Sequence, residues 1–557
     1  MLKKALSKGI ILSLAVLLLF SACAAPTAEI IEKEVVVEKP VVQTVVVEKE
    51  VPVEIEKKVV ETVIVEKEVV VEKVAPTATP APPAKAKYVF LFIGDGMAVA
   101  QRNAAELYLA ATESTGARPE DTTLLMNTFP AQGMNTTYDL KSVIPDSAST
   151  GTALATGHKT WSGVVSMDAE GKVAYETIAE VAKANDWKVG VISSVSIDHA
   201  TPATFYAHQP TRGNYYEIAH ELANSGFDFF AGGPPKVPAG KEGDQPDALA
   251  VAEANGYLIV RGKDELGKLS PGVGKVWAMP DYKIGGNALY YEMDRPTDDV
   301  SLVGYVSKAI DLLDNPNGFF LMVEGGKIDW ACHANDAAAA IHDTVAFDKA
   351  IAEAYEFYQK HPTETLIVVT GDHETGGMTI GFAGTRYSSF FEKIQHQDSS
   401  YDDFNAMVAA WREAGDVKFE DTLPVIEKAF SLIVLPEEEK AELEAKAKDG
   451  DKEAKAKLSM ALSTLELDVL EQGFTDSMLG KEERAEDDYT YLLYGGYEPM
   501  VVKLTTILNQ KAGISWTSYS HTGIPVQTSA IGVGQEMFNG YYDQTDIHAK
   551  MMAIAGF

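Results

Sequence analysis

Short apolar runs alternate with alanine-rich segments through the folded part of this sequence, which starts near Tyr88. A continuous apolar run of strand length predicts a strand that is buried on both faces, as in a parallel sheet. The segments Tyr175 to Lys183 and Ala337 to Tyr358 have helical periodicity. Strands that alternate with helices predict an α/β fold, with a mostly parallel central sheet flanked by helices on both faces. The apolar runs are Tyr88 to Ile93, Val189 to Ser193, Phe319 to Val323 and Thr365 to Thr370.

The composition is that of a large globular protein. The chain has 557 residues, of which 46% are hydrophobic and 23% charged, enough for one big domain or two to three ordinary ones. Its formal charge is −33, from 48 basic and 81 acidic residues. This charge argues against a nucleic-acid partner, because phosphate backbones demand basic patches. A small anionic substrate stays open, since a metal cluster can reverse the sign of the local field.

The first residues have the pattern of a targeting segment. Positive charge at residues 1–4 precedes an apolar core, Ile10 to Phe20, and then Ser21-Ala22-Cys23. This resembles a bacterial lipoprotein signal, which implies that residues 1–22 are removed and Cys23 is lipidated. An ordinary signal peptide or a retained anchor helix are the alternatives. In each case we expect an exported protein, and the lipoprotein form would be anchored to the outer side of a bacterial membrane.

Three further regions have unusual composition. Between residues 23 and 86, a Val-Val-Val-Glu-Lys repeat at irregular spacing leads into a Pro/Ala/Thr linker, Pro76 to Pro83. We expect a stalk that holds the folded domain, 87–557, off a membrane; a β-rich oligomerisation segment is the alternative. Two insertions are expected within that domain. The stretch 226–283 is rich in Gly and Pro, and 382–500 contains charged helix typical of a solvated cap.

The run after Phe319-Phe320-Leu321-Met322 offers ligands for two kinds of metal. Glu324 should emerge at the carboxyl end of a strand, where open α/β sheets bind ligands. Asp329 and His333 are four residues apart, which places both side chains on one face of a helix. A carboxylate with an imidazole suits zinc, and an isolated glutamate suits magnesium. The alternative is a solvated glutamate beside an incidental Asp/His pair.

Four other clusters have residue types that suit metal or phosphate. Asp95 lies between two glycines after the first strand, and Asp372-His373 lies in a glycine-rich turn after another. Ser147 follows Asp146 in a small-residue turn that opens a helix, where backbone N–H groups favour an oxyanion. His521 lies among small residues near the C-terminus. Ordinary helix caps would explain Asp95 and the Asp146-Ser147 pair, and a structural role would explain His521.

In their order along the chain, these five clusters resemble the alkaline phosphatase family, from about Tyr88 to the C-terminus. The resemblance implies hydrolysis of small phosphate monoesters with release of inorganic phosphate, two zinc ions and one magnesium ion per chain, and homodimers as a common assembly. By position it assigns Asp329, His333 and His521 to the first zinc, Asp372 and His373 to the second, Asp95 to a bridge from the second zinc to the magnesium, and Glu324 and Thr201 to the magnesium.

The same resemblance assigns the residues that act on phosphate. Ser147 matches the nucleophile that becomes transiently phosphorylated, activated by the second zinc while the first holds the leaving-group oxygen. Arg212 matches the arginine that grips phosphate, and Asp146 the carboxylate that orients it. His199 and Trp330 stand where several members carry other residues, near the third metal or the water network beside phosphate. These two positions leave open which ion fills the third site.

Two related enzymes and one non-enzyme remain alternatives. Phosphodiesterases of the superfamily usually present a threonine nucleophile without the Asp-Ser-Ala context found at Ser147. Sulfatases need a Cys/Ser-x-Pro-x-Arg motif, which is absent after Ser147. A catalytically inert, stalked surface lipoprotein is the third alternative. We expect Cys332 to be a small buried thiol, and the remaining histidines to be structural or surface residues: His158, His208, His220, His342, His361, His396 and His548.

Overall fold

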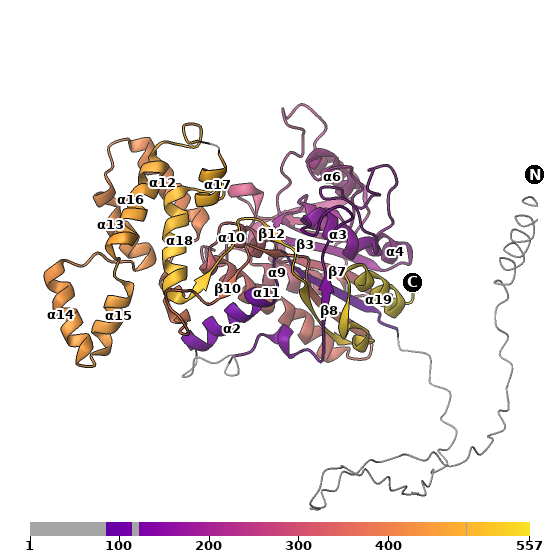
Figure 1. Ribbon diagram of the computed structural model, residues 1–557. Helices are drawn as coiled ribbons and strands as arrows, with labels where there is room; N and C mark the ends of the chain where they lie inside the picture. Colours follow the sequence, from indigo (N-terminus) through magenta and orange to yellow (C-terminus); the bar gives the residue numbers. More distant parts are fainter. Residues whose placement is uncertain (1–84, 114–121, 486) are drawn as a thin grey trace, which may run out of the picture. The chain divides into compact units, whose positions relative to one another are not determined.

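A computed structural model of the chain describes residues 85–113, 122–485 and 487–557, all within one compact unit, Ala81–Phe557 (Figure 1). The expected signal, the lipidation site Cys23 and nearly all of the stalk therefore lie outside the described residues. Within the described ranges, no helix is long and apolar enough to cross a membrane.

A ten-stranded sheet forms the centre of the unit, which confirms the predicted α/β class. Every pairing in it is parallel except those of β13, which runs antiparallel to β8 and β2. All four apolar runs are strands of this sheet. In spatial order the strands are β14 (Gly540–Asp543), β2 (Ala131–Thr136), β13 (Val526–Gly532), β8 (Thr365–Gly371), β1 (Tyr88–Gly94), β7 (Phe319–Glu324), β3 (Lys188–Ser196), β4 (Phe229–Gly233), β6 (Lys275–Met279) and β5 (Tyr257–Arg261).

Helices cover both faces of the sheet because successive side chains of its buried strands point to opposite sides. In β1, Phe90 and Phe92 belong to one apolar cluster, whereas Leu91 and Ile93 belong to another. The first cluster includes residues of α2 (Val99–Glu113), α9 (Leu302–Leu313) and α11 (Ala337–Lys360). The second includes residues of α3 (Ser147–Thr156), α4 (Ile178–Ala184), α6 (Tyr215–Asn224) and α19 (Thr545–Ala555).

The stretch 226–283, expected as an insertion, contains strands of the central sheet. It contains β4, β5 and β6, which extend the sheet beyond β3, together with α7 (Ala248–Ala254) and α8 (Gly262–Gly267). Its Gly and Pro residues lie largely in the connections and in β4, where Gly233 passes so close to Asn287 that a Cβ would lie 1.9 Å from the carbonyl oxygen. The glycines there therefore serve close backbone approach within the fold.

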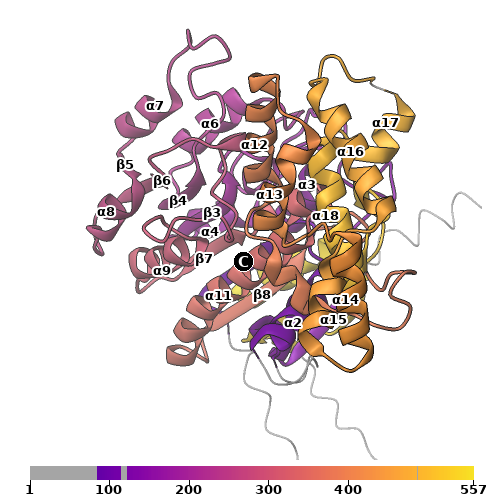
Figure 2. The ribbon, with the colours of Figure 1, turned by 90° about the vertical axis from the view of Figure 1, so that its left-hand side faces the viewer.

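Most of the stretch 382–500 is helical. The helix α18 (Pro499–Ala512) follows it and packs on α12 and α16, as Figure 2 shows. No residue of α14 is buried, so that helix has the solvated character expected for this stretch. The elements are the 3₁₀ helix η4 (Phe391–His396), α12 (Tyr401–Ala414), α13 (Phe419–Phe430), α14 (Glu437–Lys448), α15 (Lys452–Met460), α16 (Thr464–Met478) and α17 (Asp488–Tyr494).

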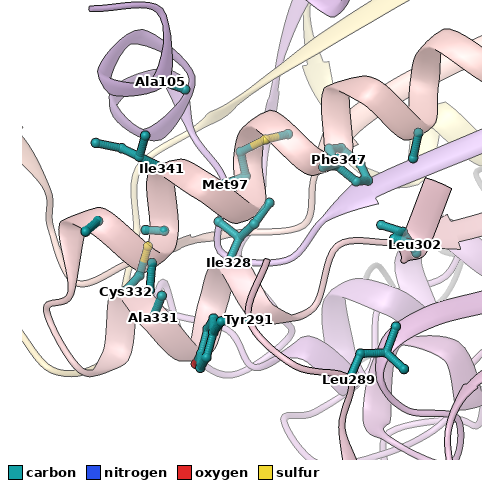
Figure 3. Packing of buried hydrophobic residues seen from close by; sticks show 14 of the residues in the cluster. Met97, Ala105, Leu289, Tyr291, Leu302, Ile328, Ala331, Cys332, Ile341 and Phe347 are labelled. Carbon is teal, nitrogen blue, oxygen red and sulfur yellow. The ribbon is translucent and has the colours of Figure 1, made fainter. Parts of the chain in front are cut away.

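The short helix α10 (Lys327–His333) presents one face to the core and the other to a cluster of polar residues. Its residues Ile328, Ala331 and Cys332 lie in the apolar cluster, and Ile328 points toward Phe347 of α11 in Figure 3. Cys332 is fully buried, as predicted. Because Ile328, Ala331 and Cys332 anchor one side of the helix, Asp329 and His333 project together from another.

Candidate metal centre

The parallel strands bring the candidate ligands to one edge of the sheet. β1 pairs with both β7 and β8, in registers that align Ile93 with Glu324 and Gly94 with Gly371. Asp95 and Asp372 come directly after these strand ends, and Glu324 is the last residue of β7. All three carboxylates are fully buried. The carboxyl ends of central parallel strands are where such sheets bind ligands.

Asp329, His333 and His521 form the first group of candidate ligands. The Nε2 atoms of His333 and His521 lie 3.1 Å apart. Nε2 of His333 is 3.4 Å from Oδ1 of Asp329, and Nε2 of His521 is 3.6 Å from the same oxygen. Each Nδ1 faces a carbonyl oxygen, of Tyr519 at 2.6 Å and of Pro145 at 2.7 Å. A carbonyl only accepts, so Nδ1 carries the hydrogen and both Nε2 lone pairs face each other and a carboxylate. A cation between them satisfies all three ligand atoms.

The pairing of two short strands places His521 in this group. β12 (His521–Thr522) pairs antiparallel with β9 (Glu374–Thr375), so that His521 lies opposite Thr375. The buried carboxylate of Glu374 holds this turn together, because it accepts from Thr522 Oγ1, from Gln101 and from two backbone N–H groups. The rings of His373 and His521 consequently stack, with centroids 3.6 Å apart.

Asp95, Asp372 and His373 form the second group, in which every side chain is fully buried. Nε2 of His373 lies 3.4 Å from Oδ1 of Asp95 and 3.2 Å from Oδ2 of Asp372. Thr375 Oγ1 donates its hydrogen to Asp329, so it accepts from Nδ1 of His373 at 3.3 Å. The Nε2 lone pair of His373 thus also points at carboxylates, which again fits a cation.

A third group contains Asp95, Glu324 and His199, beside Thr201. Among the described residues, both oxygens of Asp95, Oε1 of Glu324 and Oγ1 of Thr201 have no hydrogen-bond partner although they are buried. Buried oxygens are normally paired, so these unpaired ones fit a hard cation such as magnesium. Nε2 of His199 faces Arg212 Nη2 at 3.3 Å, and since arginine only donates, that nitrogen accepts and Nδ1 carries the hydrogen.

The ionisation of the buried carboxyl groups supports the same conclusion. Burial raises the pKa of Asp95 well above its usual value and the pKa of Glu324 to about 7. Burial, with the charge of Asp329, raises the pKa of Asp372 to about 8. Burial lowers the pKa of His373 well below its usual value, so this ring is neutral and able to ligate. Divalent cations would compensate the charges that the protein alone leaves uncompensated.

Ser147 and Arg212 lie in the same pocket as the first group. Ser147 opens α3, whose N-cap Asp146 accepts from the backbone N–H of Ser149 at 3.0 Å. The other oxygen of Asp146 accepts from Arg212 Nη1 at 2.9 Å. Asp146 therefore caps the helix and also holds the guanidinium. The Ser147 hydroxyl lies 3.3 Å from Nε2 of His373, which connects the serine to the second group.

Gly96 leaves room for two of these groups to approach each other. Its φ of +70° favours glycine, and a Cβ there would lie 2.9 Å from Cα of Asp329 and from Oγ1 of Thr375. Its N–H donates to Oδ1 of Asp372 at 3.1 Å. The glycine after Asp95 is thus required where the backbones of β1 and α10 crowd the ligands.

The pocket, of about 280 Å³, has walls that the sequence motifs did not predict. Tyr401 and Tyr497 line it together with Trp330, and both tyrosines come from the helical stretch to which the sequence assigned no chemistry. No local pattern marks either tyrosine. The ring of Trp330 lies 5.7 Å from that of His199, so these two departures from the motif are neighbours. The remaining histidines belong to none of the candidate ligand groups found among the described residues.

Comparisons with known proteins agree with this geometry. The alkaline phosphatase family model matches residues 86–557. The chain is 29% identical to alkaline phosphatase 4 and 30% identical to alkaline phosphatase 3 of Bacillus subtilis, in each case over 83% of this chain and 87% of the relative. A cold-active alkaline phosphatase from a psychrophilic Shewanella has a TM-score of 0.66 at 27% identity, over 84% of this chain and 99% of its own. The chain therefore belongs to the alkaline phosphatase family of metal-dependent phosphoesterases.

Proposed function

We propose that this protein hydrolyses phosphate monoesters through a phosphoserine intermediate on Ser147 and releases inorganic phosphate. The supporting observation is the position of the Ser147 hydroxyl, at a helix N-terminus and 3.3 Å from Nε2 of His373. Arg212 lines the same pocket. A nucleophile, an anion-binding helix end and a guanidinium within one pocket suit attack on a phosphoryl group.

The donor types indicate which residues would hold which ion. Zinc at the first group (Asp329, His333, His521) and the second group (Asp95, Asp372, His373), with magnesium at Asp95, Glu324 and Thr201, would lower the pKa of the serine hydroxyl and offset charge on the phosphoryl oxygens. The Nδ1–H bonds to the carbonyls of Tyr519 and Pro145 keep His333 and His521 in the tautomer that ligation requires.

The chain's own residues position the phosphoryl group. Arg212 gives one Nη1–H to Asp146 and one Nη2–H toward His199, which leaves one hydrogen on each nitrogen for a two-pronged contact with phosphate oxygens. A lysine could not make both contacts. In an in-line displacement the leaving group departs opposite the nucleophile. Since Ser147 adjoins the second group, the leaving group would face Asp329, His333 and His521.

A panel of substrates tests the proposal. We expect the protein loaded with zinc and magnesium to hydrolyse p-nitrophenyl phosphate much faster than bis-p-nitrophenyl phosphate or p-nitrophenyl sulfate. Chelation should abolish this activity, and the two ions together should restore it. Ser147→Ala should lose turnover and the phosphoenzyme detected by mass spectrometry, whereas Ser149→Ala, two residues later on α3, should keep both. Undiminished turnover by Ser147→Ala would overturn the mechanism.

Location and assembly are proposed from the sequence. The N-terminal pattern supports an exported protein anchored through Cys23 to the outer side of a bacterial membrane. Labelled palmitate should enter the wild-type chain and not Cys23→Ser. The formal charge of −33 supports a function without a nucleic-acid partner. A homodimer is supported by the family alone, and light scattering would measure it.

A further inference from the structure

A second pocket of about 430 Å³ opens beside the candidate active site. Three tyrosines line it, Tyr491 and Tyr494 of α17 and Tyr497 just after that helix. Tyr491 is 51% exposed, so much of its ring is free to contact a ligand. The volume is within the range of pockets that bind small organic molecules.

The two pockets have one lining residue in common. Tyr497 lines the 430 Å³ pocket and also the pocket that contains Ser147 and Arg212. Its ring lies 5.7 Å from that of Tyr401, which lines the active-site pocket, and 6.5 Å from that of Tyr519. The second pocket therefore adjoins the active-site pocket at Tyr497.

The second pocket adjoins the first ligand group. The Tyr491 hydroxyl lies 3.0 Å from Oγ of Ser520, the residue before His521, and its ring lies 6.4 Å from that of Tyr519. The backbone carbonyl of Tyr519 in turn accepts from Nδ1 of His333. The row of tyrosines thus extends from the group that the leaving group faces under the proposed mechanism.

The charges around the pocket do not favour an ionic ligand. Arg484 and Arg412 share the carboxylate of Glu498, at 3.0 and 2.7 Å. The pocket's other cation, Lys481, lines it together with Asp487 and Asp488, so these three basic and three acidic side chains carry no net formal charge. A neutral aromatic ring, stacked on exposed tyrosine, is the ligand that this lining suits.

We propose that this pocket binds a neutral aromatic part of the leaving group, so that phosphate monoesters carrying such a ring beyond the ester oxygen, such as nucleoside 5′-monophosphates, are preferred substrates. This inference rests on the proposed monoesterase function. Stacking of a base on an aromatic side chain corresponds to about a tenfold effect or more on binding.

A matched pair of esters tests the pocket. Adenosine 5′-monophosphate and 1-O-methylribose 5-phosphate share a primary 5′ alcohol as leaving group and differ in the base. We expect the metal-loaded enzyme to have a kcat/KM about tenfold higher for the nucleotide. Tyr491→Ala should reduce this ratio toward one, and Tyr491→Phe, which retains the ring, should preserve it. Leu492→Ala, at the next and 73% exposed position of α17, is the control and should also preserve it.

The ratio within each variant corrects for any loss of folded protein. Adenosine should also inhibit hydrolysis of p-nitrophenyl phosphate competitively, about tenfold more strongly than 1-O-methylribose does. A wild-type ratio near one, or a ratio that survives in Tyr491→Ala, would overturn the inference and leave the monoesterase proposal intact. Hydrolysis of neither ester, nor of p-nitrophenyl phosphate, would overturn the monoesterase proposal itself.

Discussion

The substitution Asp146→Asn separates the two roles of this carboxylate. An asparagine keeps the oxygen that caps α3 through Ser149, but it turns an NH₂ group toward Arg212 in place of the oxygen now 2.9 Å from Nη1. Burial acts to raise the pKa of Asp146, but Arg212 and the cap hydrogen bond together lower it by more, so the net pKa lies below the usual value and the group is charged at neutral pH. The side chains of Arg212 and Asp146 are 26% and 21% exposed, so the pair is partly buried.

A hydrogen bond between charged groups contributes about 1.5–3 kcal/mol, so losing this one should weaken phosphate binding by about tenfold or more. We expect the inhibition constant of inorganic phosphate and the KM for p-nitrophenyl phosphate to rise together. The kcat should not fall by the same factor, because weaker binding of phosphate also speeds release of the product.

Asp146→Ala is the companion variant. It should weaken phosphate equally and also lose the helix cap, at a further cost of about 1 kcal/mol in urea unfolding compared with Asp146→Asn. The measurements are steady-state kinetics, phosphate inhibition and denaturation on the same preparations. An inhibition constant unchanged in Asp146→Asn would refute the view that the carboxylate holds the arginine for phosphate.

Three other predictions concern the metal centre. His521→Ala should lower bound zinc by about one ion per chain, measured by elemental analysis. Retention of all zinc would contradict the assignment of a zinc ion to the first group. Without metal, burial gives Glu324 and Asp372 pKa values of about 7 and 8, so the folded state holds more protons than the unfolded state. The chelated protein should therefore lose thermal stability as pH rises from about 5 to 8, and added metal should remove this pH dependence. A thermal stability that does not change with pH in chelator would contradict the prediction. Gly96→Ala should lower metal affinity and stability more than Gly415→Ala, where φ is also positive but nothing lies within 4 Å, and equal losses would show that backbone strain alone is responsible.

The strands predicted correctly are those covered by helices on both faces. β1, β7 and β8 lie in the middle of the sheet, where continuous apolar sequence is required, so their pattern is unambiguous. β4 is only five residues long and ends in two glycines, and its segment consequently resembled an insertion. β13 mixes small and polar residues with few apolar ones, so periodicity alone does not identify it.

The candidate site likewise contains residues that the sequence predicted and residues that it did not. Asp95, Glu324 and Asp372 follow central strands, and the topology of a parallel sheet was enough to predict their approach. Tyr401 and Tyr497 reach the pocket through the packing of α12 and the segment after α17, which depends on long-range contacts that no local motif records. Thr375, which fixes the tautomer of His373, lay within a recognised glycine-rich run but had no metal-ligand chemistry to draw attention to it.

The pairing of β12 with β9 has a consequence for the order in which this protein matures. His521 is residue 521 of 557, so the first ligand group lacks its last member until nearly the whole chain has been synthesised. The strands that carry the other ligands, β1, β7 and β8, are complete well before that point. A chain that terminates upstream of residue 521 would retain Asp329 and His333 but lack the third protein ligand that a catalytic zinc site requires. The first group can therefore be completed only by a chain that includes residue 521.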